Sequence, residues 1–554
     1  MVRDLRRLAD TRWDLLVVGA GVYGCAVACD AAQRGLQVAL IDRGDLGSGA
    51  SFHSLKTVHG GLRSLQSLNL VQMRRFIRER RALARTVPHL LRPLPFVVPT
   101  TSAPQRSASA MRVALALNDL IANDRNDGIR DAALHLPHGE VLDRPHALAH
   151  LPALAPDGLT GAARWWDYQM VYAERVHLAH ALTAATHGAC VAPYVAATGL
   201  RRSRDTSTGG ARALSTVDGI TAHDRLSDET FDIRARAVIN TTGASSGEVA
   251  RWALEGGRPT TGPLLSRAMN LVLDLPPTTF AQGGRVDGRF LFLVPWGPWT
   301  MLGTSHDVAP VRDGMPEVTG ADVDRFLADG QRAFPRAGLT RDRVRLVHRG
   351  LLPMTSGHGT QVSLVKESAV VNHADEGAPG LISVHSVRYT TARHTAEQAV
   401  TLAFTALGYD VPPASVSENT PLVGGDIADM AAHETSVARA AGDMLTEAQA
   451  TRLSRAYGTE AFEVIARMQR DRSLASALSD QCSVTGAEVQ HAVEAEGAVT
   501  LADALIRRTS AGTSGCPDDV ALATAASVMG EHQHWTSERR QREQEDVREF
   551  YRVR

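Results

Sequence analysis

The sequence predicts an α/β protein in which a Rossmann-like domain is interleaved with an antiparallel-sheet domain and followed by a helical C-terminal domain. Three observations predict this fold class: a strand, glycine turn, helix and second strand within residues 15–42; a hairpin pattern at residues 288–307; and helical spacing after a Pro/Ser/Gly-rich linker at residues 411–425. A chain of 554 residues is long enough for two or three domains with separate cores.

The first element is an apolar strand, Leu15–Val18, and helical spacing then continues from Gly24 to Gly35. Leu36–Ile41 is the second strand, and it ends at Asp42. Between strand and helix, Gly19, Gly21 and Gly24 form G-x-G-x-x-G, which permits a tight turn, close approach of the main chain to a pyrophosphate, and helix–strand contact. Asp42 is placed to accept hydrogen bonds from an adenosine ribose, so the combination predicts a dinucleotide site.

The next segment, residues 43–66, decides between NAD and FAD. It is polar, rich in glycine and serine, and has no hydrophobic period, which is unlike the continuation of an NAD-binding domain. Such a segment can wrap a large polar ligand and offer donors to a pyrophosphate and to flavin carbonyls. We therefore favour FAD, with candidate contacts at Arg43, Ser51, Lys56, His59, and the amides of Gly60 and Gly61.

The following elements are less specific. A helix with Leu70, Met73 and Ile77 on one side runs to Pro88, and its arginines are expected to form a solvated face. The proline-broken run from Arg92 predicts an edge strand or a crossing between domains. Further helix and strand patterns occupy residues 173–187, 189–200 and 234–240.

The composition excludes several classes of protein. Lys and Arg number 59 and Asp and Glu 60, so the net charge of −1 implies no chain-wide attraction to nucleic acid. The five cysteines are scattered without the spacing of a metal site or a disulfide framework, and we expect neither. No segment reads as a secretory signal or a membrane span. We expect the chain to be cytoplasmic, either free or held peripherally at the inner membrane face.

Residues 14–66, with the glycine turn and the later run SLKTVHGGLRSLQ, resemble the FAD-dependent glycerol-3-phosphate dehydrogenases. The resemblance continues through residues 88–100, 238–244, 293–307, 388–399 and 488–509. It implies a discontinuous FAD-binding domain at 11–90, 160–260 and 355–410, a substrate domain at 91–159 and 261–354, and a helical domain at 420–554. It also implies flavin contacts at Thr242, Gly243, Thr390 and Thr391.

The same resemblance implies hydride transfer to FAD from a hydroxyl-bearing carbon, with electrons passed to quinone or another acceptor. Arg63, Lys366 and Arg388 match or lie near basic residues that the family uses for substrate. Other positions depart from the family: Ser64 for tyrosine, Asn270 for histidine, Leu352 for arginine, and Ser386 and Val387 for glycines. The implied substrate is therefore glycerol 3-phosphate or a related phosphorylated polyol, which is anionic in either case.

The proton acceptor remains open among His59, His306 and His385, and His385 is the catalytic candidate because it precedes Arg388 by three residues. Two alternatives also remain open: an FAD-dependent oxidase of an amine or amino acid, and a catalytically weakened flavin-binding protein. The sequence leaves undecided the oligomeric state, the natural acceptor and whether FAD is covalently attached.

Overall fold

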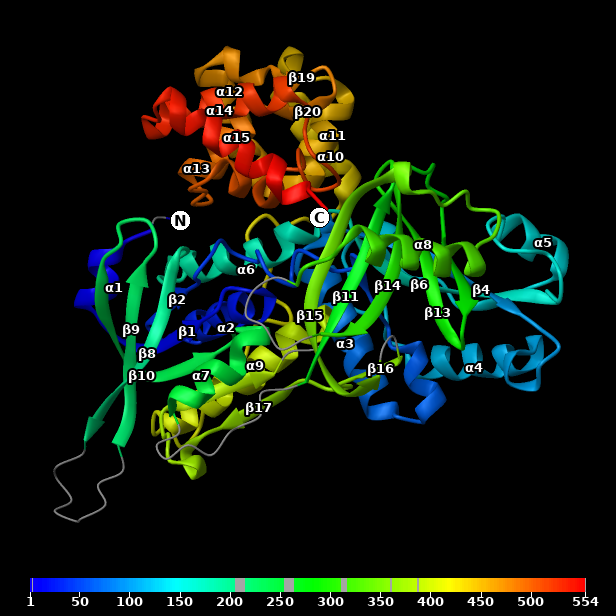
Figure 1. Ribbon diagram of the computed structural model, residues 1–554, viewed down its shortest axis with the longest axis horizontal. Coiled ribbons are helices and arrows are strands. Elements are labelled where there is room, and N and C mark those ends of the chain that lie inside the picture. Colours follow the sequence, from blue (N-terminus) through cyan, green and yellow to red (C-terminus); the bar gives the residue numbers. More distant parts are fainter. Residues whose placement is uncertain are drawn as a thin grey trace.

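The computed structural model describes residues 1, 3–204, 215–253, 264–309, 316–358, 361–385 and 388–553 (Figure 1). The first sheet is built around β1 (Arg12–Val18), which pairs in parallel with β2 (Val38–Ile41) and β10 (Thr230–Asn240). Its strand order is β17-β18-β10-β1-β2-β7, with β8 (Val195–Arg204) and β9 (Ser215–Asp224) joined beside β10. The remaining strands are β7 (Cys190–Ala192), β17 (Ala369–Asn372) and β18 (Leu381–His385).

Both faces of this sheet are buried, which explains the continuous apolar run of β1. Leu15 and Val17 belong to a core with α2 (Val22–Gln33), α6 (Ala173–Thr186) and α9 (Ala392–Ala406). Leu16 and Val18 belong to the core on the opposite face, because successive side chains of a strand alternate. Short helices α1 (Leu5–Asp10) and α7 (Ser246–Ala253) also pack against this sheet.

The second sheet is mainly antiparallel, as expected, with the order β16-β15-β11-β14-β13-β12-β4-β6-β3 and with β5 beside β6. The predicted hairpin at residues 288–307 is confirmed, since β13 (Arg289–Trp296) and β14 (Trp299–Val308) pair through Trp296 and Trp299. Helix α8 (Gly320–Ala333) packs on one face through Phe326 and Leu327. The other strands are β3 (Thr57–Val58), β4 (Leu91–Thr100), β5 (Glu140–Leu142), β6 (Gly161–Met170), β11 (Leu264–Leu273), β12 (Ala281–Val286), β15 (Val344–His358) and β16 (Gln361–Leu364).

One expectation about this sheet needs correction. Strand β4 lies between β12 and β6 rather than at an edge. Its prolines at 93, 95 and 99 alternate with other residues, so their missing N–H groups fall on one side of the strand, and β12 pairs there at only Phe96 and Val97. Strands β3, β6 and β16 join the second sheet although the expected ranges placed them with the FAD-binding segments, because β6 pairs along the whole of β4. The domain ranges remain a proposal.

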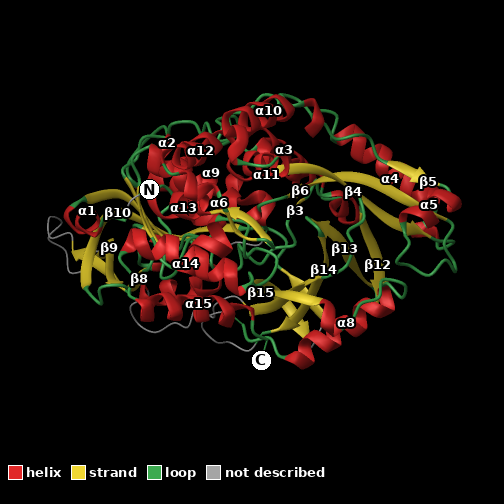
Figure 2. Ribbon diagram, turned by 90° about the horizontal axis from the view of Figure 1, so that it is seen from above, coloured by secondary structure: helices red, strands yellow, loops and turns green. Residues whose placement is uncertain are grey.

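The chain from residue 430 onward is mainly helical, as expected, with one short hairpin, and has cores of its own. It lies over α6 and one end of the second sheet (Figure 1), whereas α4 (Ala108–Ile121) and α5 (Arg144–His150) extend beyond it when seen from above (Figure 2). Within the described residues no helix is both long and apolar enough to cross a membrane. The domain comprises α10 (Met430–Ala441), α11 (Glu447–Tyr457), α12 (Ala461–Arg470), β19 (Ala477–Ser479), β20 (Cys482–Thr485), α13 (Gly486–Glu494), α14 (Asp519–Gln533) and α15 (Ser537–Tyr551).

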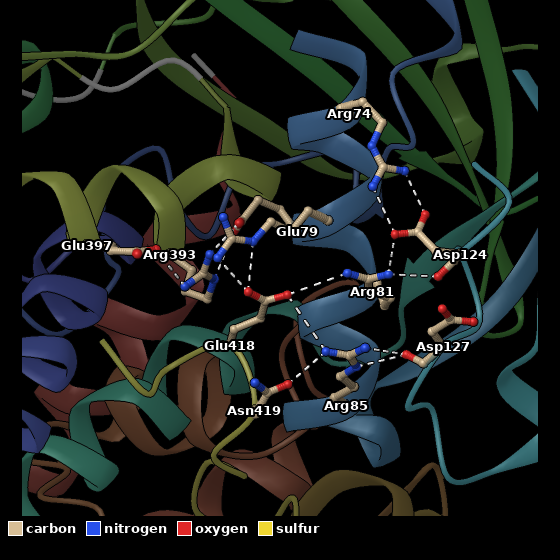
Figure 3. A network of polar contacts seen from close by, with 11 residues as sticks. Arg74, Glu79, Arg81, Arg85, Asp124, Asp127, Arg393, Glu397, Glu418 and Asn419 are labelled. Carbon is tan, nitrogen blue, oxygen red and sulfur yellow. Dashed lines mark hydrogen bonds and ion pairs between the residues drawn. The ribbon is translucent and has the colours of Figure 1, made fainter. Parts of the chain in front are cut away.

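The arginines of α3 (Leu70–Thr86) form a network of ion pairs rather than the solvated face that the sequence indicated (Figure 3). Arg74 and Arg81 both bind Asp124 at 2.6 Å. Glu418, in the linker to the C-terminal domain, accepts a hydrogen bond from Arg78 at 2.7 Å. The network therefore ties α3 to segments that are distant in the sequence.

Candidate functional site

The glycine turn is a cradle that a side chain would fill. Gly19 has φ +99°, and a Cβ atom there would lie 2.8 Å from the carbonyl oxygen of Thr241. A Cβ atom on Gly24 would lie 1.8 Å from the carbonyl oxygen of Gly19. The first contact brings β1 against the end of β10, and the second brings α2 against the turn. This bare main chain at the N-terminus of α2 is suited to a diphosphate.

Asp42 and Ser51 lie beside this turn. The amides of Ala20 and Gly44 donate to the Asp42 carboxylate at 2.6 and 2.8 Å, and the amide of Val22 donates to Ser51 Oγ at 2.9 Å. Burial raises the pKa of Asp42 to about 6, so the carboxylate is ionised at neutral pH. Its oxygens each have a second lone pair for ribose hydroxyls. Arg43 is exposed, and its carbonyl oxygen accepts a hydrogen bond from Arg225 at 2.8 Å.

Lys56 is a buried cation rather than an open donor. Its ammonium donates to the carbonyl oxygen of Phe52 at 2.5 Å and lies 4.5 Å from the Phe52 ring and 5.3 Å from the Trp296 ring. Burial lowers its pKa to about 8. Lys56 therefore helps to hold the segment around Phe52 in place from the protein interior.

The HGG segment, His59–Gly61, makes several hydrogen bonds and close contacts within the protein itself. The amide of His59 donates to Thr390 Oγ1 at 3.2 Å, and the His59 ring lies 3.1 Å from Thr57 Oγ1. The expectation of an open amide at Gly60 was wrong, because this amide donates to Asp167 at 2.6 Å. Gly61 has φ +78°, and a Cβ atom there would lie 2.8 Å from the Phe76 ring.

The remaining candidate cofactor residues follow the carboxyl ends of β10 and β18, next to the end of β1. Thr242 donates twice to Asn240 Oδ1, and Gly243 has φ +60° with open space around its Cα. Thr390 and Thr391 are buried at the start of α9. The carboxyl edge of a parallel sheet is where such folds bind ligands. The cradle, the ribose acceptor and these segments together fit a dinucleotide with an attached ring system.

Lys366 and Arg388, predicted as substrate residues, line one narrow cavity together with Gln72, Arg75 and Phe76. The Arg388 guanidinium lies 5.0 Å from the Phe76 ring. Gln72 donates to the carbonyl oxygen of Lys366 at 3.0 Å. The cavity therefore collects three cationic side chains, from α3, from the segment before β17 and from the segment after β18.

The sequence reasoning missed Gln72 and Arg75. Their spacing with Phe76, at i, i+3 and i+4, places all three on one face of α3, and this was the available signal. Arg75 lies 3.6 Å from Glu367 in a half-exposed ion pair. The side chain of Arg63 lies outside what the structure describes, and so do Ser386 and Val387.

The three candidate histidines lie in different places. His385 Nδ1 lies 3.3 Å from Ser246 Oγ, burial lowers the His385 pKa, and His385 is not among the described residues that line the cavity. His306 Nδ1 lies 3.2 Å from Ser266 Oγ, and burial lowers its pKa to about 4. Like His385, His59 is not among the described residues that line the cavity. The surrounding protein and, to a smaller extent, Arg388 lower the His59 pKa.

Comparison with known proteins agrees with this geometry. Residues 14–397 match the family model of FAD dependent oxidoreductases, and residues 415–540 match that of the C-terminal domain of alpha-glycerophosphate oxidase. A glycerol-3-phosphate dehydrogenase of Synechocystis sp. is 29% identical, covering 97% of this chain and 96% of the relative. The mitochondrial glycerol-3-phosphate dehydrogenase of Mus musculus is 31% identical, covering 97% and 73%.

A solved structure shares the fold. The glycerol-3-phosphate dehydrogenase from Bacillus halodurans, complexed with FAD, superposes with a TM-score of 0.74 at 22% identity, covering 99% of this chain and 96% of that one.

Proposed function

The chain belongs to the FAD-dependent oxidoreductase family, and from this premise we propose that it oxidises glycerol 3-phosphate or a closely related phosphorylated polyol. Bound FAD supplies the acceptor for a hydride from the hydroxyl-bearing carbon. The observation that carries the proposal is the convergence of Arg75, Lys366 and Arg388 on one cavity beside Thr391, at the start of α9. A phosphate dianion is the substrate group that such a set of cations recognises.

The cations are held in place before substrate arrives. The hydroxyl of Tyr23 donates to the carbonyl oxygen of Arg388 at 2.7 Å, and Phe76 supports the Arg388 guanidinium. Gln72 holds the main chain at Lys366 and accepts a hydrogen bond from Ser64 Oγ at 3.1 Å. Preorganised donors of this kind bind an anion at a lower cost in conformational entropy.

His59 is the proton acceptor that we favour. Its pKa lies below the usual 6.5, so the ring is neutral at pH 7 and can take the proton of the substrate hydroxyl. Its amide donates to Thr390, the residue before Thr391, and Thr391 lines the cavity together with Arg388, which supports this choice. His385, which contacts Ser246, is the alternative acceptor.

Exposed apolar side chains near the start of α3, the helix that lines this cavity, and on α4 support a quinone as acceptor and peripheral contact with a membrane. Leu68 and Val71 are 78% and 73% exposed at the start of α3, and Leu117 and Leu120 are exposed on α4. The two helices share a small core, in which Met73 and Ile77 of α3 pack with Ala122 at the end of α4. An exposed apolar surface suits an acceptor that partitions into lipid.

The membrane proposal is tested by sedimentation with anionic lipid vesicles. We expect a double variant, Leu117→Ser with Leu120→Ser, to lose most vesicle binding and quinone reduction while keeping substrate-driven flavin reduction. Val411→Ser is the control, since Val411 is 84% exposed but lies in the linker. Equal binding by both variants would refute the proposed contact surface.

The substrate proposal is tested by mixing the FAD-loaded protein anaerobically with glycerol 3-phosphate and following the flavin absorbance. Lys366→Met should raise the KM at least tenfold, because a charge-assisted bond contributes about 1.5–3 kcal/mol. Arg78→Met should leave KM unchanged, since Arg78 also lies on α3 but binds Glu418. Rapid reduction by an amino acid and fast reoxidation by oxygen with release of peroxide would favour the oxidase alternative.

A further inference from the structure

The loop that joins Asp42 to Ser51 contains a buried carboxylate, Asp45, that no cofactor contact explains. Asp45 is buried, and its carboxylate accepts hydrogen bonds from two consecutive arginines. Arg507 Nε donates to it at 2.5 Å, and the two terminal nitrogens of Arg508 donate at 2.8 and 2.6 Å. Both arginines belong to a π-helical turn, Asp503–Arg508, of the C-terminal domain.

The Asp45 carboxylate meets two positive charges in a buried site, and Asp503, which binds Arg507, supplies the second negative charge. The side chains of Asp45 and Arg508 are each 1% exposed, and that of Arg507 is 8% exposed. The two guanidinium groups hold the pKa of Asp45 well below its ordinary value, so the carboxylate is ionised. A buried charge that loses its partner is strongly destabilising, so the loop can occupy this position only while the arginines are docked.

The arginines are themselves held in place. Arg507 also binds Asp503 at 2.6 Å, and the hydroxyl of Tyr194 donates to Asp503 at 2.7 Å. Arg508 Nε donates to the carbonyl oxygen of Glu496 at 3.1 Å. The C-terminal domain therefore presents a rigid pair of donors to the loop. π-helical turns are frequent at functional sites.

The other side of the loop is bonded to the dinucleotide cradle. The amide of Gly47 donates to the carbonyl oxygen of Ala20 at 2.9 Å, and the amide of Gly44 donates to Asp42. At the loop's far end, Ser51 accepts the hydrogen bond from the first residue of α2. A Cβ atom on Gly47 would lie 1.9 Å from His177 Nε2, so the His177 ring packs directly against the main chain of the loop.

We propose that Asp45, Arg507 and Arg508 are positioning residues for FAD: the C-terminal domain holds the 42–51 loop in the conformation that binds the dinucleotide. Docking of the domain and binding of the cofactor are then coupled, and each strengthens the other. The inference rests on FAD as the cofactor and is independent of which substrate is oxidised.

The test compares the affinity of the apoprotein for FAD, measured by quenching of flavin fluorescence, among matched variants. We expect Asp45→Asn and Arg508→Met to raise the Kd for FAD at least tenfold, and Arg508→Lys to fall between Arg508→Met and wild type. Arg452→Met is the control, because Arg452 forms a buried bidentate pair with Glu488 inside the same domain. It should bind FAD within twofold of wild type.

Two further readouts separate positioning from stability alone. FAD should slow proteolysis of the linker at residues 411–425 in the wild type, and Asp45→Asn should abolish that protection. If the variants do not fold, hydrogen exchange of residues 503–508 in the wild type gives the answer: slowing by FAD supports the coupling, and no change overturns it.

Folded Asp45→Asn and Arg508→Met proteins that bind FAD within twofold of wild type would overturn the inference. At saturating FAD, both variants should still be reduced by glycerol 3-phosphate. Wild-type protein that binds FAD but is not reduced by this substrate would refute the proposed function and leave the coupling standing.

Discussion

The structure shows how much space a Cβ atom would have at each glycine of the cradle. This space predicts how strongly each replacement by alanine weakens FAD binding. A Cβ atom on Gly24 would lie 1.8 Å from the Gly19 carbonyl oxygen, on Gly19 2.8 Å from the Thr241 carbonyl oxygen, and on Gly21 3.1 Å from Ser51 Oγ. Gly49, in the same loop as Ser51, has no atom within 4 Å of this position. Replacement of each by alanine should therefore weaken FAD binding in the order Gly24, Gly19, Gly21, Gly49.

The magnitudes follow from what must move. Gly24→Ala pushes main chain against main chain, so about 3 kcal/mol, or roughly 100-fold in FAD affinity, is expected. Gly21→Ala meets a hydroxyl that can rotate away, so about 1 kcal/mol, or roughly fivefold, is expected. Gly49→Ala should change binding less than about twofold.

The assay is titration of each apoprotein with FAD, with the thermal unfolding midpoint of the apoprotein measured alongside. Gly49→Ala should unfold no earlier than wild type, because alanine restricts the unfolded chain. If Gly24→Ala bound FAD as tightly as Gly49→Ala, the cofactor would not lie on this turn. The reasoning from the cradle would then be refuted.

Three further predictions concern single groups. The FAD affinity of the wild type should fall as the pH drops through about 6, where Asp42 becomes protonated and accepts fewer hydrogen bonds. Asp42→Asn should bind FAD about tenfold more weakly at pH 7.5, and its affinity should not change with pH in this range. A variant with the pH dependence of the wild type would contradict this assignment. The kcat/KM for substrate should fall on the acid side below pH 6.5, where His59 becomes protonated, and His59→Ala should lose about 100-fold or more; if His385→Ala does so instead, His385 is the base. Glu79→Gln should lower the unfolding free energy by about 3–5 kcal/mol in a urea titration, because it leaves Arg393 buried without its main partner. Glu397→Gln, at the partly exposed partner of the same arginine, should cost less than about 1 kcal/mol, and equal losses would contradict the assignment.

Local patterns predicted much of the fold. The periodicity and glycine spacing of residues 15–42 predicted β1, the turn, α2 and β2, because these features depend on residues close in the sequence. The hairpin at Trp296 and Trp299 was predicted for the same reason. Each of these elements carries its signal within about thirty residues.

Long-range pairing could not be predicted in this way. The arginines of α3 look like a solvated face until Asp124 and Glu418 arrive from segments more than forty residues away. The amide of Gly60 looks open until Asp167, 107 residues later, accepts its hydrogen bond. The clamp on Asp45 is likewise invisible in the sequence, since Arg507 lies 462 residues away.

The altered family positions do not leave the proposed substrate cavity without charge. Leu352, where the resemblance expects an arginine, is half-buried on β15 opposite Ser266, while α3 contributes Arg75 to the cavity beside Lys366 and Arg388. The partner of Arg75, Glu367, lies 3.6 Å away and is about half exposed, and a loose pair of this kind contributes at most about 1 kcal/mol. A substrate phosphate can therefore replace Glu367 at small cost and gain the attraction of three cations. The electrostatics of this cavity favour an anionic polyol over the zwitterionic amino acid of the oxidase alternative, because nothing among the described lining residues but Glu367 would attract an ammonium group.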